Sequence, residues 1–231
     1  MGCCRRDPLT SVALIDKYSL LLFDLDGTLA DTHQLIFDSF NHILRKYKSI
    51  EMTPKEILSY FGPPEEVCIK NMLNPDDFDM VWSDFLGYYS SHLKESKVFE
   101  GVQELLKNVK SRRKLMGVFT AKGTRTAELT LGYHCIENFF DIVVTGSSVK
   151  NHKPDPEGIV IALTKLGVPA AKTIVIGDSP SDYKASVAAG SDFIAVTYDS
   201  ISRNRFDGIE CVKASSVRDL ASLLLGEGNI N

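Results

Sequence analysis

The 231-residue chain predicts an α/β protein built on a parallel sheet, with an all-helical segment inserted near its N-terminus. Short apolar runs near residues 20–23, 115–119 and 173–177 each stop at polar residues, which is typical of buried strands in a parallel sheet. Helical patterns separate these runs, as parallel pairing requires. From about residue 32 to 97 the alternation stops and only helical patterns remain.

The sheet-forming part is expected to occupy residues 18–31 and 98–231, after an N-terminal tail of residues 1–17. An amphipathic helix is expected at the end of the chain, over Val217 to Leu225. The remaining strands are expected near residues 141–145, 192–197 and 209–212.

The segment of residues 32–97 is expected to form several helices around a core of its own. Ile36, Phe40 and Ile43 recur at helical spacing, and a second long amphipathic pattern runs from Val81 to Leu93. Prolines and glycines divide the stretch between these two patterns. Hinges are expected where the chain enters and leaves this segment, near residues 30–33 and 96–100.

Two aspartates, Asp24 and Asp26, follow the first apolar run and can point the same way from an extended backbone. The carboxyl ends of parallel strands are where open α/β sheets bind ligands. Close carboxylates repel each other unless they share a cation or a proton, and Mg²⁺ prefers such oxygen ligands. An ionised Asp24 can attack a phosphoryl group, while Asp26 can protonate the leaving oxygen and then activate water. Gly27 would let the backbone turn beside the phosphate, and Thr28 would supply a hydroxyl.

An Asp-Leu-Asp-Gly turn alone is ordinary, so the rest of such a site must come from other strand ends. Thr120 ends the second run, where free N–H groups at a helix start suit a phosphate. Lys153 precedes the prolines that open a helix and is expected to aim its ammonium group inward. Asp178 ends the third run and is expected to complete a metal site with Asp24. Asp182, one helical turn later, would hold Asp178, Lys153 or a metal-bound water in place.

In this order, the motifs resemble those of the haloacid dehalogenase superfamily of aspartate-nucleophile phosphohydrolases. Within it, the chain is most similar to phosphoglycolate phosphatases and related bacterial pyrophosphatases with a helical cap. The resemblance implies a three-layer, Rossmann-like parallel sheet, with residues 32–97 as an inserted helical cap subdomain that closes over the site. The motifs that carry it lie between residues 20 and 190 and are Asp24-Leu25-Asp26-Gly27-Thr28, Thr120, Lys153-Pro154 and Gly177-Asp178 with Asp182.

The resemblance also implies a role for each motif residue. Asp24 would be the nucleophile and a metal ligand, and Asp26 the general acid/base with its backbone carbonyl on the metal. Asp178 would be the other carboxylate ligand of Mg²⁺. Asp182 and Ser179 would contact these ligands or their waters rather than the ion. The expected phosphate-binding residues are Gly27, Thr28, Thr120, Ala121 through its N–H, and Lys153.

Substrate selection is expected to involve His33 and Gly62. His33 and the loop Phe61-Gly62-Pro63-Pro64 are expected to face the substrate across the cleft. His33 also occupies a helix-start position, so a purely structural role is an equal alternative. The sequence departs from the related phosphatases after the penultimate strand, where Tyr198-Asp199-Ser200 replaces a Trp-Gly or similar pair.

The implied function is an Mg²⁺-dependent phosphohydrolase of a small phosphorylated metabolite that works through an aspartyl-phosphate. Phosphoglycolate is the first candidate substrate and inorganic pyrophosphate the second. A β-phosphoglucomutase-like phosphoryl transferase remains an alternative enzyme, and a non-catalytic module that binds a phosphorylated ligand is an alternative outside enzymology.

Composition narrows the class of protein further. A net charge of −4 provides no basic surface for nucleic acid, and no apolar run approaches the ~18 residues needed to span a bilayer. Five cysteines without a metal-binding spacing are typical of reduced thiols, so a cytoplasmic location is expected. A monomer is expected in preference to a homodimer.

Overall fold

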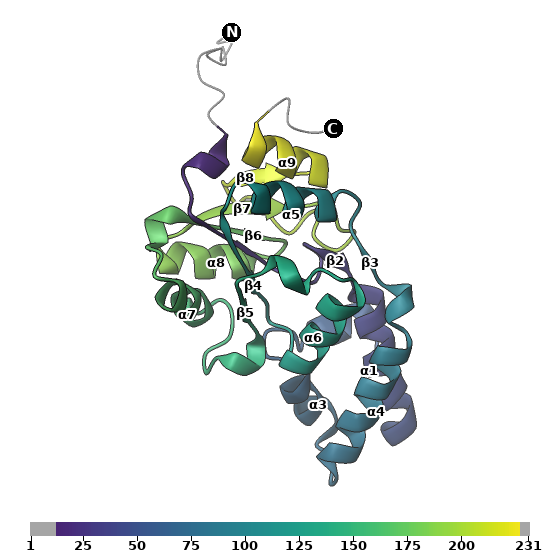
Figure 1. Ribbon diagram of the computed structural model, residues 1–231. Helices are drawn as coiled ribbons and strands as arrows, with labels where there is room; N and C mark the ends of the chain where they lie inside the picture. The colour runs from purple at the N-terminus through teal and green to yellow at the C-terminus, as the bar shows by residue number, and fades with distance from the viewer. Residues whose placement is uncertain (1–12, 227–231) are drawn as a thin grey trace.

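A computed structural model describes residues 13–226, and its centre is a six-stranded sheet in the order β5-β4-β1-β6-β7-β8 (Figure 1). Every neighbouring pair in this sheet is parallel, as the apolar runs predict. The chain winds from the central strand β1 to β4 and β5, and then crosses to β6 on the other side of β1. That reversal places a ligand-binding crevice at the carboxyl end of β1. The strands are β1 (Leu20–Phe23), β4 (Leu115–Phe119), β5 (Ile142–Val144), β6 (Thr173–Gly177), β7 (Asp192–Val196) and β8 (Val212–Ala214).

Helices cover both faces of the sheet and give it three layers (Figure 1). Side chains alternate along β1, so Leu21 and Phe23 pack against α5, α6 and α9. Leu20 and Leu22 face the opposite layer, formed by α7 and α8. The predicted three-layer α/β fold is confirmed. Its helices are α5 (Val102–Ser111), α6 (Thr124–Tyr133), α7 (Glu157–Leu166), α8 (Pro180–Ala189) and α9 (Val217–Leu225).

Four further helices lie beyond the carboxyl edge of the sheet and enclose an apolar cluster of their own (Figure 1). Phe40, Phe85 and Tyr89 are fully buried in this cluster, so the aromatic side chains of the insertion serve as its core. Asp77 caps the last of these helices by accepting a hydrogen bond from the N–H of Met80. The four helices are α1 (His33–Lys48), α2 (Pro54–Leu58), α3 (Glu65–Leu73) and α4 (Phe78–Ser91).

The two chain segments that join this helical insertion to the sheet lie side by side. β2 (Ala30–Asp31) pairs with β3 (Lys97–Val98) in an antiparallel ladder. This ladder is where the sequence predicts hinges. The division into a core of residues 18–31 and 98–231 and a cap of residues 32–97 stays a prediction, as does hinge motion.

Both ends of the described chain differ in detail from the sequence expectations. Of the expected tail, residues 1–12 lie outside the described residues, whereas Leu14–Asp16 form a short 3₁₀ helix. Ile15 in this helix is fully buried, because its apolar side chain belongs to the same hydrophobic cluster as those of α9. The last strand begins at Val212 rather than 209, because a turn in which Gly208 has a φ of 78° precedes it.

Candidate active site

A cavity of about 390 Å³ lies between the carboxyl edge of the sheet and the helical insertion. The strand ends and the insertion contribute opposite parts of its lining. Gly27, Thr28 and Asp182 lie outside the lining, although the other predicted site residues belong to it. Those lining residues are Asp24, Asp26, His33, Gly62, Thr120, Ala121, Lys153, Asp178 and Ser179.

Asp24 directly follows β1, and its backbone N–H donates to the carbonyl of Ile176 in β6. This extension of the parallel ladder holds the carboxylate at the floor of the cavity. Burial raises the pKa of Asp24 to about 6, because the charge of Lys153 offsets only part of the desolvation while Asp182 and Asp26 add repulsion. The carboxylate is therefore ionised at neutral pH and able to act as a nucleophile.

Lys153 places its ammonium group against the Asp24 carboxylate. Its Nζ lies 2.9 Å from Oδ1 of Asp24 and 2.6 Å from Oδ1 of Asp182, and it donates to the carbonyl of Phe119. Burial lowers the pKa of Lys153, but the two carboxylates outweigh that effect and raise the pKa above its ordinary value. The ammonium group therefore stays charged and fixed beside Asp24.

Asp182 is held in place by the first turn of α8. Its Oδ2 accepts hydrogen bonds from the hydroxyl and the N–H of Ser179, and the Asp182 N–H donates back to the Ser179 hydroxyl. Of the three contacts that the sequence allows for Asp182, the structure shows the one to Lys153.

The acidic groups can hold a divalent cation. Asp24, Asp178 and Asp182 are buried, and each offers an oxygen within 4.8 Å of the others. Burial, followed by the charges of Asp24 and Asp182, raises the pKa of Asp178 well above its ordinary value. Arg205 offsets part of this charge, with Nη1 at 3.3 Å from Oδ2 of Asp178. Such crowded carboxylate oxygens fit Mg²⁺, which needs one or two protein carboxylates beside water and phosphate oxygens.

Asp26 is oriented by two donors, neither of which the sequence analysis predicted. Its Oδ1 accepts hydrogen bonds from the Thr32 hydroxyl and from Nζ of Lys122 at 3.2 Å. The Lys122 side chain is fully buried, with Nζ also 3.3 Å from Oε1 of Glu65 and above the ring of Tyr89. Burial lowers the pKa of Lys122. The neighbouring Asp26, Tyr89 and Glu65 outweigh this effect and raise that pKa well above its ordinary value. The position of Lys122, two residues after Thr120 at the end of a predicted strand, was the feature of the sequence that could have indicated a role in the site.

Glu65, at the start of α3, joins the helical insertion to the sheet domain. Its Oε2 accepts the N–H of Gly123, and its Oε1 accepts the hydroxyl of Thr126. These donors belong to the first turn of α6, where the helix dipole also favours a carboxylate. In a second contact, the Tyr89 hydroxyl lies 2.7 Å from Oγ1 of Thr130. Sequence reasoning gave no role to Glu65, because its partners lie about sixty positions away.

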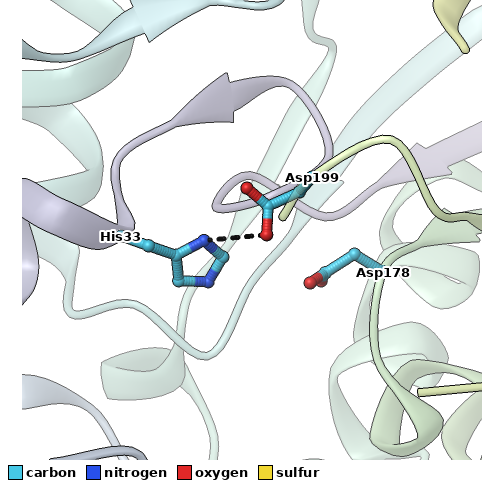
Figure 2. A group of neighbouring side chains, drawn as sticks. All are labelled: His33, Asp178 and Asp199. Atoms are coloured by element: carbon cyan, nitrogen blue, oxygen red, sulfur yellow. Dashed lines mark ion pairs between the residues drawn. The ribbon is translucent and has the colours of Figure 1, made fainter. Parts of the chain in front are cut away.

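His33 lies beside Asp199 and faces Asp178, as Figure 2 shows, and both His33 and Asp178 line the cavity. Its Nδ1 is 3.4 Å from Oδ2 of Asp199, and all three side chains are buried. Burial lowers the pKa of His33, but the contact with Asp199 and the charge of Asp178 raise it by more. Asp199 comes from the segment after β7, where the sequence departs from the related phosphatases. His33 is thus placed against the acidic groups through this segment.

Gly27 and Thr28 lie outside the cavity lining, and Gly27 is close to Asp178 and His33. A Cβ at Gly27 would lie 2.7 Å from Oδ2 of Asp178 and 2.8 Å from the His33 ring, and the φ of Gly27 is 76°. The glycine therefore makes room for Asp178. The hydroxyl of Thr28 is buried without a hydrogen-bond partner among the described residues, while its carbonyl accepts from Tyr198. The phosphate-binding roles predicted for both residues stay predictions.

The parallel sheet thus gathers aspartates at its strand ends and a lysine from the loop before α7, under a helical insertion. The haloacid dehalogenase-like hydrolase family matches residues 21–196, and the chain belongs to this family. The family, the fold and the enzyme class expected from the sequence are confirmed.

Relatives and solved structures agree with this assignment. The chain is 33% identical over 183 residues to pyrophosphatase PpaX of Bacillus velezensis, which covers 79% of this chain and 84% of that one. PpaX of Bacillus pumilus is 34% identical to this chain over 179 residues, and the aligned region covers 77% of this chain and 82% of that one. The structure of a predicted phosphoglycolate phosphatase from Haemophilus somnus has a TM-score of 0.79 at 23% identity, covering 90% and 98% of the two chains. CbbY of Rhodobacter sphaeroides, in complex with phosphate, has a TM-score of 0.77 at 20% identity, covering 88% and 96%.

Proposed function

We propose that this chain is an Mg²⁺-dependent phosphohydrolase of a small phosphorylated metabolite, with an aspartyl-phosphate on Asp24 as intermediate. The observation that carries the proposal is the fixed contact of Lys153 with Asp24, beside the buried Asp178. A nucleophile, a permanent cation and a metal-binding carboxylate thus converge in one cavity at the carboxyl edge of the sheet.

The first step forms a bond between a carboxylate oxygen of Asp24 and phosphorus, and it breaks the bond from phosphorus to the leaving oxygen. Lys153, the Thr120 hydroxyl and the N–H of Ala121 bind the transferring phosphoryl oxygens. Asp26 gives its proton to the leaving oxygen. Lys122 and Thr32 hold the Asp26 carboxylate in place for this transfer.

In the second step, Asp26 takes a proton from a water molecule whose oxygen attacks the phosphorus of the aspartyl-phosphate. The acyl-phosphate bond breaks, inorganic phosphate leaves and Asp24 returns to its carboxylate form. Asp24, Asp178 and the backbone carbonyl of Asp26 would hold Mg²⁺, which supplies the positive charge that lets an anionic nucleophile approach an anionic phosphate.

The family resemblance favours phosphoglycolate as the substrate, and the relatives named PpaX favour pyrophosphate. Phosphoryl transfer to a sugar and non-catalytic binding are the alternatives. The proposed partner is the small metabolite alone, bound by a monomer. None of the helices within residues 13–226 combines the length and apolar character needed to cross a bilayer.

The proposal is tested by phosphate release, with Mg²⁺ or with a chelator, from phosphoglycolate, pyrophosphate, sugar phosphates and nucleoside monophosphates. We expect Mg²⁺-dependent release that falls by about a thousandfold or more in Asp24→Asn, because the amide is no nucleophile. Asp16→Asn is the matched control, since this carboxylate is exposed on the short N-terminal helix away from the cavity. Undiminished hydrolysis by Asp24→Asn would contradict the nucleophile assignment. Transfer of phosphate to a sugar, without free phosphate, would favour the transferase.

A further inference from the structure

The wall of the cavity that the helical insertion supplies is apolar apart from His33 and Glu65. Ile36 and Phe40 come from α1, and they are joined by the side chain of Leu58 at the end of α2. The following loop exposes Phe61, which is 37% accessible to solvent. The other apolar members of this wall are Pro63 and Cys68.

The two polar side chains of this wall at α3 are already occupied. Both carboxylate oxygens of Glu65 accept hydrogen bonds from the first turn of α6. The thiol of Cys68 donates to the carbonyls of Tyr60 and Pro63. Burial, with the charges of Glu65 and Glu66, raises the pKa of Cys68 to about 12, so this thiol is neutral. Neither group is available to neutralise a charged leaving group.

The lysines and the arginine that line the cavity belong to the sheet domain, and each is paired with a carboxylate. The histidine that the insertion contributes, His33, is paired in the same way, with Asp199. No lysine or arginine of residues 32–97, all of which the structure describes, lies in the lining. The paired cations are Lys122 with Asp26 and Glu65, Lys153 with Asp24 and Asp182, and Arg205 with Asp178. Three cations thus face five carboxylates before any substrate enters.

We propose that the site selects phosphate monoesters of an uncharged, largely apolar alcohol, and that it discriminates against a second anionic group on the substrate. This inference rests on the proposed phosphohydrolase function and names its substrate class. A carboxylate or second phosphate against the wall of Ile36, Leu58 and Phe61 would lose its hydration without gaining a counter-charge. Phosphoglycolate and pyrophosphate both carry such a group. Both are therefore expected to be poor substrates here, although the resemblance and the relatives named PpaX favour them.

The test compares esters that differ by one carboxylate, using the full chain with Mg²⁺. Ethyl phosphate is paired with phosphoglycolate, and phenyl phosphate with 4-carboxyphenyl phosphate, while pyrophosphate is measured alongside. In each pair, the uncharged ester is expected to have a kcat/KM at least about tenfold higher, and the same margin is expected over pyrophosphate.

A substitution in the wall provides the second measurement. Phe61→Arg places a cation at the exposed edge of the wall and is expected to reduce the tenfold preference to about threefold or less. Met80→Arg is the matched control, because Met80 is also exposed on the insertion but lies outside the cavity lining. Its preference is expected to equal that of the unmodified chain.

The outcomes separate this inference from the function on which it rests. A kcat/KM for phosphoglycolate, 4-carboxyphenyl phosphate or pyrophosphate that equals or exceeds that of the uncharged esters overturns the inference and leaves the phosphohydrolase intact. An unchanged preference in Phe61→Arg, with the variant folded, overturns the role of the wall. Absence of Mg²⁺-dependent phosphate release from every compound overturns the proposed function and the inference together.

Discussion

Asp24 and Asp178 are carboxylates that bind protons more tightly in the folded chain than in the unfolded chain. The pKa of Asp24 is raised from 3.8 to about 6, so between these pH values Asp24 is protonated to a greater extent in the folded state than in the unfolded state. The free-energy contribution of Asp24 to folding of the metal-free protein therefore falls as pH rises through that window. The raised pKa of Asp178 acts in the same direction.

A divalent cation reverses this loss, because it takes the place of the protons on these carboxylates. We expect the affinity for Mg²⁺ to fall by about tenfold per pH unit below pH 6, where Asp24 must lose a proton to hold the ion, and the raised pKa of Asp178 adds to this fall. The measurement is the Mg²⁺-induced rise in melting temperature at pH 5 and at pH 7, with the larger rise expected at pH 7. Asp178→Asn should remove most of the rise. An equal rise at both pH values would argue against these carboxylates as ligands.

Gly27 provides a second test at the scale of single residues. Gly27→Ala would place a Cβ within 3 Å of both Asp178 and His33, in a backbone conformation that alanine rarely adopts. We expect a loss of about 1–3 kcal/mol in the free energy of unfolding and a tenfold or greater loss of activity.

Gly87→Ala is the matched control for this substitution. Gly87 lies in α4 with open space around its Cβ position, so alanine should stabilise the helix by up to about 1 kcal/mol without changing activity. A Gly27→Ala enzyme with unchanged activity and stability would show that this close approach does not constrain the site.

At the scale of elements, α3 is joined to α6 by buried charge. Lys122→Met leaves the carboxylates of Asp26 and Glu65 without their shared cation, and a loss of about 3–5 kcal/mol is expected in urea unfolding. Adding Glu65→Gln removes one of the two stranded charges. The double variant should therefore be more stable than the sum of the single losses predicts, by about 1 kcal/mol or more.

The control for this pair is Glu51→Gln, which breaks the exposed ion pair with Arg45 in the same insertion. Its effect is expected to stay below about 1 kcal/mol, since exposed pairs contribute little. Strict additivity of the Lys122 and Glu65 variants would mean that the two side chains do not depend on each other.

Most of the strands and helices could be predicted from the sequence, because the apolar side chains that form the local patterns are also those that pack in the core. β1, β4 and β6 are short apolar runs that end at polar residues, and the parallel sheet brings those ends to one edge. Lys153 reaches the same edge from the loop between β5 and α7, where it contacts Asp24. Lys122 and Glu65 were missed because a buried pair between distant segments leaves no periodic pattern. Likewise, Asp199 reaches His33 through an irregular segment.

At the scale of the whole molecule, the α/β order along the chain predicted the three-layer sheet and its helical insertion. The order of strands around β1 and the seating of the insertion on α6 depend on tertiary contacts that the pattern does not encode. The substrate is underdetermined for the same reason, because the wall opposite Asp24 is assembled from three helices and a loop. Only the assembled cavity shows that this wall carries no lysine or arginine from residues 32–97.

The central claim is that Asp24 accepts the phosphoryl group. The most direct measurement is a rapid acid quench during turnover of the best ester, followed by mass spectrometry of the peptides. We expect the peptide that contains Asp24 to gain one phosphoryl group, and borohydride reduction to identify Asp24 as the modified residue. Asp24→Asn should show neither. Turnover that leaves this peptide unmodified, or that modifies another residue, would contradict the account.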